Sequence, residues 1–485
     1  MEARNIFRNI SPIDHRYSVS EESLFESLVP WISEEASIAV CVKAEMALII
    51  AHLSLRGALN PAARAELEQA AAAVDPAKVY AEEEKTRHNI RALVNVLKRK
   101  VPEKFAPLVH LGATSVDILD TGLSYRMAGV TREIVLPKLK ELELLLCDFT
   151  EREAETPQVG RTHGQHAVPI TLGFAIAEYV SRLGKSIIEI EKRSKELKGK
   201  LAGAVGAYNA TSMIVRDPEE LERLYLAELG LEPSEHSTQL VEPEYLLRLL
   251  LEFNVAFGII ANLADDLRNL QRSEIGEVRE GFAADQVGSS TMPQKRNPWN
   301  SEHVKSLWKA FMPRVNTFFM DQISEHQRDL SNSASQRFIA DYVAGFCLAI
   351  SRMAELVAGL GADRERLLAN LRGQAGGISG GVLAEPAYIL LAESGVSDAH
   401  ETIRKITLNA EKEKLSFAQA LAKEPDLLRR IGGKMAELGL ITAAASDNMS
   451  ADVLSFFEKP ERYSGLAAHK ARKLAQKYRN IFKGE

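Results

Sequence analysis

Long stretches of helical periodicity fill the middle of this chain, and they constrain its fold more than any other feature. The longest, from Ile170 to Leu201, contains no proline and would span about 48 Å as one helix. Similar stretches cover Leu136–Ala154, Glu244–Glu274 and Pro298–Ser324. Periodicity of this length is typical of a helical bundle or a coiled coil. No run of clean apolar–polar alternation bounded by turn residues appears, so we predict an all-α fold.

The predicted helices are shorter toward both ends of the chain. Residues 20–100 indicate medium helices that are interrupted at Pro30, at Asn60-Pro61 and at Asp75-Pro76. Helices shorten again from about Gly361. We therefore predict three domains, namely an N-terminal helical domain over 1–112, a central long-helix bundle over 113–364 and a C-terminal helical domain over 365–485.

Apolar residues on the predicted helix from Glu244 occupy more than one face. They are Leu246, Leu247, Leu249, Leu250, Leu251, Phe253, Val255, Phe257, Ile259 and Ile260. A helix that is apolar nearly all round is buried on several sides. We infer a bundle that also packs against other subunits.

Composition excludes several classes of function. The net charge of −6 gives no electrostatic case for nucleic acid binding. The most apolar long segment, Leu246–Leu267, contains several charged residues, which argues against a membrane span, and the N-terminus lacks the apolar region of a secretory signal. Cys41, Cys147 and Cys347 are far apart in apolar contexts, which favours reduced thiols in a cytoplasmic protein. No cofactor motif or zinc spacing is present, so we expect no metal and no cofactor.

One polar stretch, Gln286–Asn300 (QVGSSTMPQKRNPWN), interrupts the helices. Its glycine and two prolines predict a loop, and functional residues are concentrated on loops. Backbone N–H groups near Gly288 could turn toward an anion, and a lysine and an amide follow. Its candidates for gripping a carboxylate are Ser289, Ser290, Lys295 and Asn297. A helix-capping linker is the simpler alternative.

The segment from His110 to Asp120 (HLGATSVDILD) offers two hydroxyls just before a predicted helix. Backbone N–H groups at a helix start favour an anion, so Thr114 and Ser115 are candidates for binding a negatively charged substrate. The same residues would equally make an ordinary N-cap leading to Asp117.

A second polar block, Gly160–Ala167 (GRTHGQHA), is predicted to join two helices. It places His163 beside Thr162. An imidazole can deliver a proton to a leaving nitrogen near neutral pH. A lone histidine is more often structural, so the block by itself leaves both readings open.

Further polar segments carry arginine, serine and amide side chains. Arginine matches the geometry of phosphate and carboxylate, and serine adds donors. In the segment 328–337 these groups are Arg328, Ser333 and Arg337, which are candidates for substrate binding. Each segment taken alone could also be a solvated loop or helix surface.

Together these segments resemble the fumarase/aspartase superfamily. GSSTMPQKRNP is similar to its signature GSSxMPxKxN, in which seven of ten positions are defined. The other blocks resemble the adenylosuccinate lyase branch, namely HLGATSVDILD, RTHG followed by HA, SPIDHRY at 11–17, RDLSNSASQR at 328–337 and the Thr238-Gln239 pair. The likeness covers the chain from about residue 11 to beyond residue 400.

The resemblance implies a fold and a reaction. It implies three all-α domains, a homotetramer on a twenty-helix core, and active sites that draw residues from three subunits. The implied reaction is β-elimination of fumarate by C–N cleavage, with Ser289 as the base, His163 as the general acid, and Arg16 and Tyr17 at a substrate phosphate. The resemblance also implies that Arg87, His88, Asn89 and Gln239 bind the substrate. The spacing alone leaves Ser289 and Ser290 open as the base.

The implied substrates are adenylosuccinate, which would yield AMP, and succinylaminoimidazole carboxamide ribotide in purine biosynthesis. Two departures from the pattern favour an alternative. Asn89 stands where the branch carries aspartate, and the segment after Gln239 is altered. They favour a superfamily lyase on a non-nucleotide amino-dicarboxylate or a 3-carboxymuconate-type cycloisomerase. A non-catalytic structural relative is a third alternative, against which the presence of Ser289, Lys295, Asn297 and His163 argues.

Overall fold

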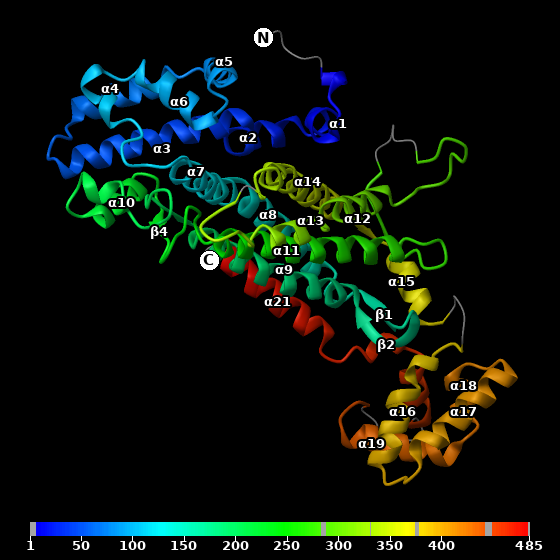
Figure 1. Ribbon diagram of the computed structural model, residues 1–485. Helices are drawn as coiled ribbons and strands as arrows, with labels where there is room; N and C mark the ends of the chain where they lie inside the picture. The colour runs from blue at the N-terminus through cyan, green and yellow to red at the C-terminus, as the bar shows by residue number, and fades with distance from the viewer. Residues whose placement is uncertain (1–5, 283–287, 330, 374–377, 442–448, 484–485) are drawn as a thin grey trace. The chain divides into compact units, whose positions relative to one another are not determined.

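The computed structural model describes residues 6–282, 288–329, 331–373, 378–441 and 449–483 (Figure 1). Helices form nearly every element, and the strands make only two-stranded pairs, so the all-α prediction is confirmed. By contacts the chain divides into two compact units. The first comprises Met1–Lys140, Lys185–Gly258 and Ser306–Ser351, and the second comprises Glu141–Gly184, Ile259–Lys305 and Arg352–Glu485.

The long helices of the middle of the chain are present. They are α8 (Leu136–Arg152), α9 (Leu172–Lys195), α11 (Glu244–Leu270), α12 (Trp299–Phe311) and α14 (Ile339–Ala358). The helix α11 is the longest, and buried apolar residues such as Leu249, Phe253 and Phe257 follow its length. The predicted central long-helix bundle is thus built from elements of the expected kind.

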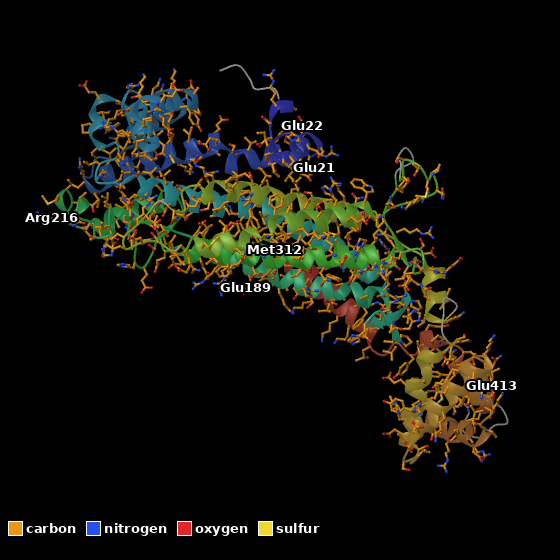
Figure 2. All side chains as sticks on the ribbon, turned by 45° about the vertical axis from the view of Figure 1, so that its right-hand side comes forward. Glu21, Glu22, Glu189, Arg216, Met312 and Glu413 are labelled. Carbon is orange, nitrogen blue, oxygen red and sulfur yellow. The ribbon has the colours of Figure 1, made fainter. Side chains whose placement is uncertain are left out.

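Several expected helix boundaries were wrong, two of them at prolines. The stretch Ile170–Leu201 is not one helix, because α9 ends at Lys195 and Lys198–Gly199 forms a short strand. The stretch Pro298–Ser324 is not one helix, because it breaks near Met312 (labelled in Figure 2) before Pro313, and α13 (Arg314–Met320) follows. Proline lacks the N–H that would continue the ladder. Conversely, Pro30 does not end its helix, since α2 (Glu22–Ile32) continues past it for one further half turn.

The first unit is centred on α3 (Glu34–Leu55), which packs against α2, α7 and α10. Its other elements are α1 (Arg16–Ser20), α4 (Pro61–Ala72), α5 (Pro76–Thr86), α6 (Asn89–Lys98), α7 (Ser115–Val130), α10 (Pro218–Ala227), β3 (Lys198–Gly199) and β4 (Glu232–Pro233). The helix interruptions predicted at Asn60-Pro61 and Asp75-Pro76 are confirmed. At each of them the polar side chain caps the helix that the proline begins. Leu48 and Ile49 on α3 are fully buried, so this helix forms the centre of the core.

The second unit holds a β-hairpin and a cluster of shorter helices. Its elements are β1 (Pro157–Thr162), β2 (Gln165–Thr171), β5 (Val278–Arg279), β6 (Gly361–Ala362), α15 (Arg364–Leu371), α16 (Ala384–Glu393), α17 (Ala399–Glu413), α18 (Phe417–Ala422), α19 (Pro425–Glu437), α20 (Met449–Phe457) and α21 (Ala467–Lys483). Helices α16 to α20 surround a separate core that contains Leu391, Phe417 and Phe457. The hairpin and these helices can be followed in Figure 1.

Two helical stretches, Glu22–Leu55 and Glu244–Leu270, have the length and composition of a membrane span. In the structure 72% and 56% of their apolar windows are buried. Core helices of water-soluble proteins have the same character, so these stretches are weak evidence for a membrane protein.

Candidate active site

The polar loop predicted at 286–300 is described from Gly288 onward, and Gln286 and Val287 lie outside the described residues. The Oγ of Ser289 accepts hydrogen bonds from the backbone N–H of Met292 (3.1 Å) and of Thr291 (3.4 Å). Two N–H groups directed at one hydroxyl oxygen stabilise negative charge on it. Among the described contacts, no hydrogen bond is made by the Ser290 side chain, so the local geometry favours Ser289 over its neighbour as a base.

The two ends of the described loop are joined to each other. The Asn297 side chain donates to the Gly288 carbonyl (3.1 Å). A Cβ on Gly288 would lie 2.2 Å from the Lys295 carbonyl oxygen, so this approach requires glycine. Lys295 itself is exposed. The loop therefore presents Ser289, Lys295 and Asn297 on one short closed segment.

The chain leaves this loop through a capped helix. The Glu280 carboxylate accepts from the backbone N–H of Asn300 (3.2 Å) and Ser301 (3.0 Å) and from the Ser301 hydroxyl (2.6 Å). A carboxylate at this position accepts from N–H groups that have no partner within the helix, and its negative charge is stabilised by the positive end of the helix dipole. It anchors the start of α12 and hence the end of the loop.

His163 lies at the turn of a β-hairpin, which corrects the expectation of a polar run between two helices. Thr162 pairs with Gln165, so His163 and Gly164 form a two-residue turn. Both have positive φ, 55° and 74°, as a type I′ turn requires. The His163 and Thr162 side chains are exposed, and no hydrogen bond to the imidazole is present within the described part of the chain. The histidine thus lies at the exposed tip of a paired β-hairpin.

The Thr114–Ser115 segment starts α7. The Thr114 N–H donates to the Asp117 side chain (2.8 Å), as in a capping box. Asp117 is fully buried and also pairs with the ammonium of Lys200. Thr114 therefore does cap the helix, as the simpler alternative supposed. The buried ion pair of Asp117 and Lys200 holds the start of α7, where the Thr114 and Ser115 hydroxyls lie.

His110 is a polar residue of this segment that our sequence analysis did not select. Its backbone N–H and its Nδ1 contact the Glu45 carboxylate at 2.9 and 2.7 Å, and Glu45 is fully buried. Its φ of 62° is uncommon for a residue other than glycine. An imidazole held in this way, four residues before Thr114, is a further candidate for substrate binding. Its position at the start of the HLGATS block is the sequence feature that could have identified it.

Arg87, His88 and Asn89 lie at the junction of α5 and α6, and all three are exposed. His88 caps α6 by accepting the N–H of Arg91 at Nδ1 (3.2 Å). The Asn89 side chain accepts the N–H of Ile90 (2.7 Å). The structure thus brings the three candidates together on an open surface of the first unit, as neighbours in the chain.

The structure also brings together candidates that are distant in the chain. The Arg328 guanidinium donates to the Gln239 side chain (3.3 Å), and the Gln239 N–H donates to the Gln327 carbonyl (3.3 Å). Burial and a hydrogen bond to Glu34 raise the pKa of the Tyr80 hydroxyl, and the nearby Arg337 guanidinium acts in the opposite direction. Arg337 therefore lies close to α5, the helix that ends at the junction described above.

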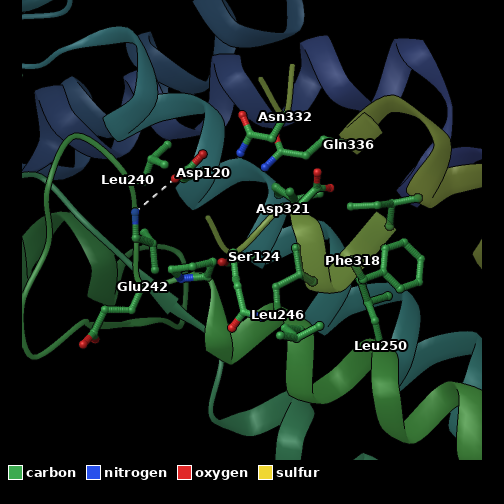
Figure 3. Close-up of a pocket in the computed structure, with 16 residues that line it drawn as sticks. Asp120, Ser124, Leu240, Glu242, Leu246, Leu250, Phe318, Asp321, Asn332 and Gln336 are labelled. Atoms are coloured by element: carbon green, nitrogen blue, oxygen red, sulfur yellow. Dashed lines mark hydrogen bonds between the residues drawn. The ribbon is translucent and has the colours of Figure 1, made fainter. Parts of the chain in front are cut away.

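Residues of the segment 332–337 differ in their exposure. Asn332 and Gln336 line a pocket with Asp120 and Asp321 (Figure 3), whereas Ser333 and Arg337 are exposed. Asp120 accepts the N–H of Val241 (3.0 Å), and burial raises its pKa to about 6. Arg16, at the start of α1, is exposed as well, and Tyr17 beside it is partly buried. The face that carries Ser333 and Arg337 is thus open to a ligand.

The fold and the serine-containing loop define a lyase. The family model described as "Lyase" matches residues 11–310, and the model described as "Adenylosuccinate lyase C-terminal" matches residues 324–440. The adenylosuccinate lyase of Pyrococcus abyssi is 32% identical over 428 residues, which cover 87% of this chain and 91% of that protein. The enzyme of Archaeoglobus fulgidus is 29% identical over 98% of this chain and 100% of its own length. The chain therefore belongs to the adenylosuccinate lyase family, a branch of the fumarase/aspartase superfamily.

Solved structures confirm the fold. A 3-carboxy-cis,cis-muconate lactonizing enzyme from Pseudomonas putida matches with a TM-score of 0.77 at 23% identity, over 95% of this chain and 98% of that one. A fumarate lyase from Mesorhizobium sp. BNC1 matches with the same TM-score at 20% identity, over 94% and 97%. At this identity the likeness concerns architecture and does not distinguish between substrates.

Proposed function

We propose that this protein is a C–N lyase that eliminates fumarate from adenylosuccinate to give AMP, and from succinylaminoimidazole carboxamide ribotide to give aminoimidazole carboxamide ribotide. The observation that carries the proposal is the similarity to adenylosuccinate lyases over about nine-tenths of their length. The segment that the lyase family model matches, residues 11–310, includes the loop with Ser289 and the hairpin with His163.

The chemistry needs a base, an acid and a place for negative charge. The proton that is removed lies beside a carboxylate and is weakly acidic, so that carboxylate must accept charge in the transition state. Lys295 and Asn297 supply donors for it on the loop. Ser289 removes the proton, and its oxygen already receives two backbone N–H groups. His163 then protonates the nitrogen that leaves.

A nucleotide substrate requires a phosphate site. Arg16, Ser333 and Arg337 are exposed polar residues of the first unit, and we propose that they hold it. Arg328, which precedes Ser333 in the chain, donates a hydrogen bond to the Gln239 side chain. Arg337→Ala should weaken nucleotide binding by about 2 kcal/mol, because it removes charge-assisted hydrogen bonds. Binding of free fumarate should stay unchanged, and calorimetry with both ligands measures the difference.

We further propose a cytoplasmic homotetramer with shared active sites. The exposed imidazole of His163, without a described partner, is consistent with a site completed by other subunits. Large apolar side chains on or beside the long helices are also exposed, namely Val255, Phe319, Met320, Ile323 and Phe338. Sedimentation should give a tetramer, and a stable monomer of 53.5 kDa at micromolar concentration would exclude it. The three cysteines are free and buried, as suits a reducing compartment.

A substrate panel tests the proposal directly. The purified protein is mixed separately with adenylosuccinate, argininosuccinate, aspartate, malate and carboxymuconate, and the release of fumarate or the change in absorbance is followed. We expect turnover of adenylosuccinate. Turnover of another member alone would reassign the substrate, and no turnover of any member would indicate a non-catalytic relative.

A further inference from the structure

A single buried carboxylate, that of Glu277, gathers donors from separate parts of the second unit. It is fully buried and accepts from both terminal nitrogens of Arg161 (2.5 and 3.1 Å), from the Gln158 side chain (2.8 Å) and from the Asn370 side chain (2.9 Å). Four donors on two oxygens fill most of the acceptor capacity of a carboxylate. The Glu277 carboxylate therefore holds four donor groups of the second unit in place.

The backbone of Glu277 is fixed as well. Its N–H donates to the Leu270 carbonyl (2.9 Å), and its carbonyl accepts the N–H of Asp363 (2.9 Å). The next residue begins β5, which pairs with β6. The carboxylate is thus presented from a rigid position, so the groups bound to it inherit that position.

Two of the groups that it binds belong to the strand that leads to His163. Gln158 and Arg161 lie in β1, and His163 follows Arg161 by two residues. From Thr162 to His166 every side chain is exposed, whereas Gln158 is buried and the Arg161 side chain is only 17% exposed. The contact with Glu277 is consequently the last buried attachment of the hairpin before its turn.

We propose that Glu277 is a positioning residue for His163, acting through Arg161. This inference rests on the proposed role of His163 as the proton donor. A general acid must lie within hydrogen-bond reach of the atom it protonates, and an error of about 1 Å can cost about 100-fold in rate. The hairpin has no other buried polar anchor among the described residues near its tip, so this ion pair fixes the height and tilt of the turn.

The charge of Glu277 is essential to this role. A glutamine has the same shape, but its NH2 group would face a guanidinium or an amide donor. The arginine would then be partly buried opposite a neutral group, which is costly. Glu277→Gln should therefore loosen the stem of the hairpin while it leaves the helices in place.

The first measurement is independent of substrate. Hydrogen exchange of the peptide that contains residues 157–171 is compared in the wild type and in Glu277→Gln, with α21 as the internal reference. We expect at least tenfold faster exchange in the hairpin alone. The matched control is Glu228→Gln, which removes another carboxylate that binds both terminal nitrogens of an arginine, Arg64, at the surface of the first unit. It should change neither the hairpin nor turnover.

The second measurement is a double-mutant cycle on kcat and KM. Glu277→Gln should lower kcat about 10- to 100-fold, with KM changed less than threefold. In the background of His163→Gln it should cost less than twofold more, because there is no longer an acid to position. A merely structural anchor would lower kcat in both backgrounds.

The outcomes separate the two levels of inference. Unchanged exchange in the hairpin, or an equal loss of kcat in both backgrounds, would overturn the positioning role. If the wild type turns over no substrate of the panel while the exchange difference is present, the proposed reaction fails and the anchoring of the hairpin by Glu277 stands. If Glu277→Gln does not fold, Arg161→Gln takes its place in the same double-mutant cycle, because it breaks the same ion pair at the other partner.

Discussion

The β-hairpin and the polar loop each carry one of the two proposed catalytic groups, and they are held in opposite ways. The hairpin depends on contacts with residues far from it in sequence, above all the pair of Arg161 and Glu277, which are 116 residues apart. The loop from Gly288 is held by contacts among its own residues, such as Asn297 with Gly288 and Met292 with Ser289. Residues 290–296 are exposed.

This difference teaches how a lyase can combine a fixed acid with an adjustable base. The proposed acid, His163, lies at the tip of a paired ladder that is anchored by a buried ion pair, so we expect its position to be set before substrate arrives. The loop has few contacts outside itself, and such segments lie at the low-stability end of a protein. We therefore expect the loop to change on binding and the hairpin to stay as it is.

The largest expected effect concerns the loop. Ser289→Ala should lower kcat by about three orders of magnitude or more, equivalent to roughly 4 kcal/mol. Substrate should still bind, because Lys295 and Asn297 remain. Steady-state kinetics and calorimetry measure the two quantities. Ser290→Ala is the matched control and should be nearly normal, and a reversal of the two results would move the base by one residue.

The next effect concerns the tip of the hairpin. His163→Gln should lower kcat about 10²- to 10⁴-fold, the usual contribution of a general acid. Exchange protection of the strands should persist, since the imidazole makes no described hydrogen bond. Mixing this variant with Ser289→Ala and reassembling the subunits should restore part of the activity. Verified mixed tetramers without any recovery would contradict shared sites.

A smaller effect is expected at the stem. A Cβ on Gly160 would lie 2.7 Å from the Val168 carbonyl oxygen, opposite a bulge in β2. Gly160→Ala should therefore destabilise the hairpin by about 1–3 kcal/mol, as overpacking usually does. Hydrogen exchange of residues 157–171 reports it. Gly433→Ala in α19, where the Cβ meets nothing within 4 Å, is the control and should leave stability equal or higher.

The smallest change requires no substitution. Without ligand, a protease should cut the chain within 288–297 before it cuts the hairpin, and substrate or product should slow the cleavage of the loop. Mass spectrometry of the fragments identifies the sites. Equal resistance of the loop with and without ligand would contradict the expectation that the loop changes on binding.

Much of the fold could be predicted because helix signals are local. The interruptions at Asn60-Pro61 and Asp75-Pro76 were predicted correctly, since a polar cap and its proline act within one turn. Pro30 was misread because a proline removes only its own N–H hydrogen bond, and the helix continues for only two residues after it. The domain boundaries 1–112, 113–364 and 365–485 stay predictions.

The hairpin could not be predicted from its residues. A glycine at 160, a proline at 169 and a bulge disturb the alternation that identifies strands. Only the ladder between β1 and β2 shows why these residues extend. The turn at His163-Gly164 then explains why the histidine has a positive φ.

The sequence by itself supplied the proposed catalytic groups, because a serine in GSSTMPQKRNP or a histidine in RTHG carries its reactive group wherever the chain places it. The tertiary structure alone decided how firmly each group is held. The anchor at Glu277 joins donors that are 93 to 119 residues from it in the chain. No local pattern encodes such a contact, since its strength comes from burial and from the convergence of segments that meet only in the folded protein.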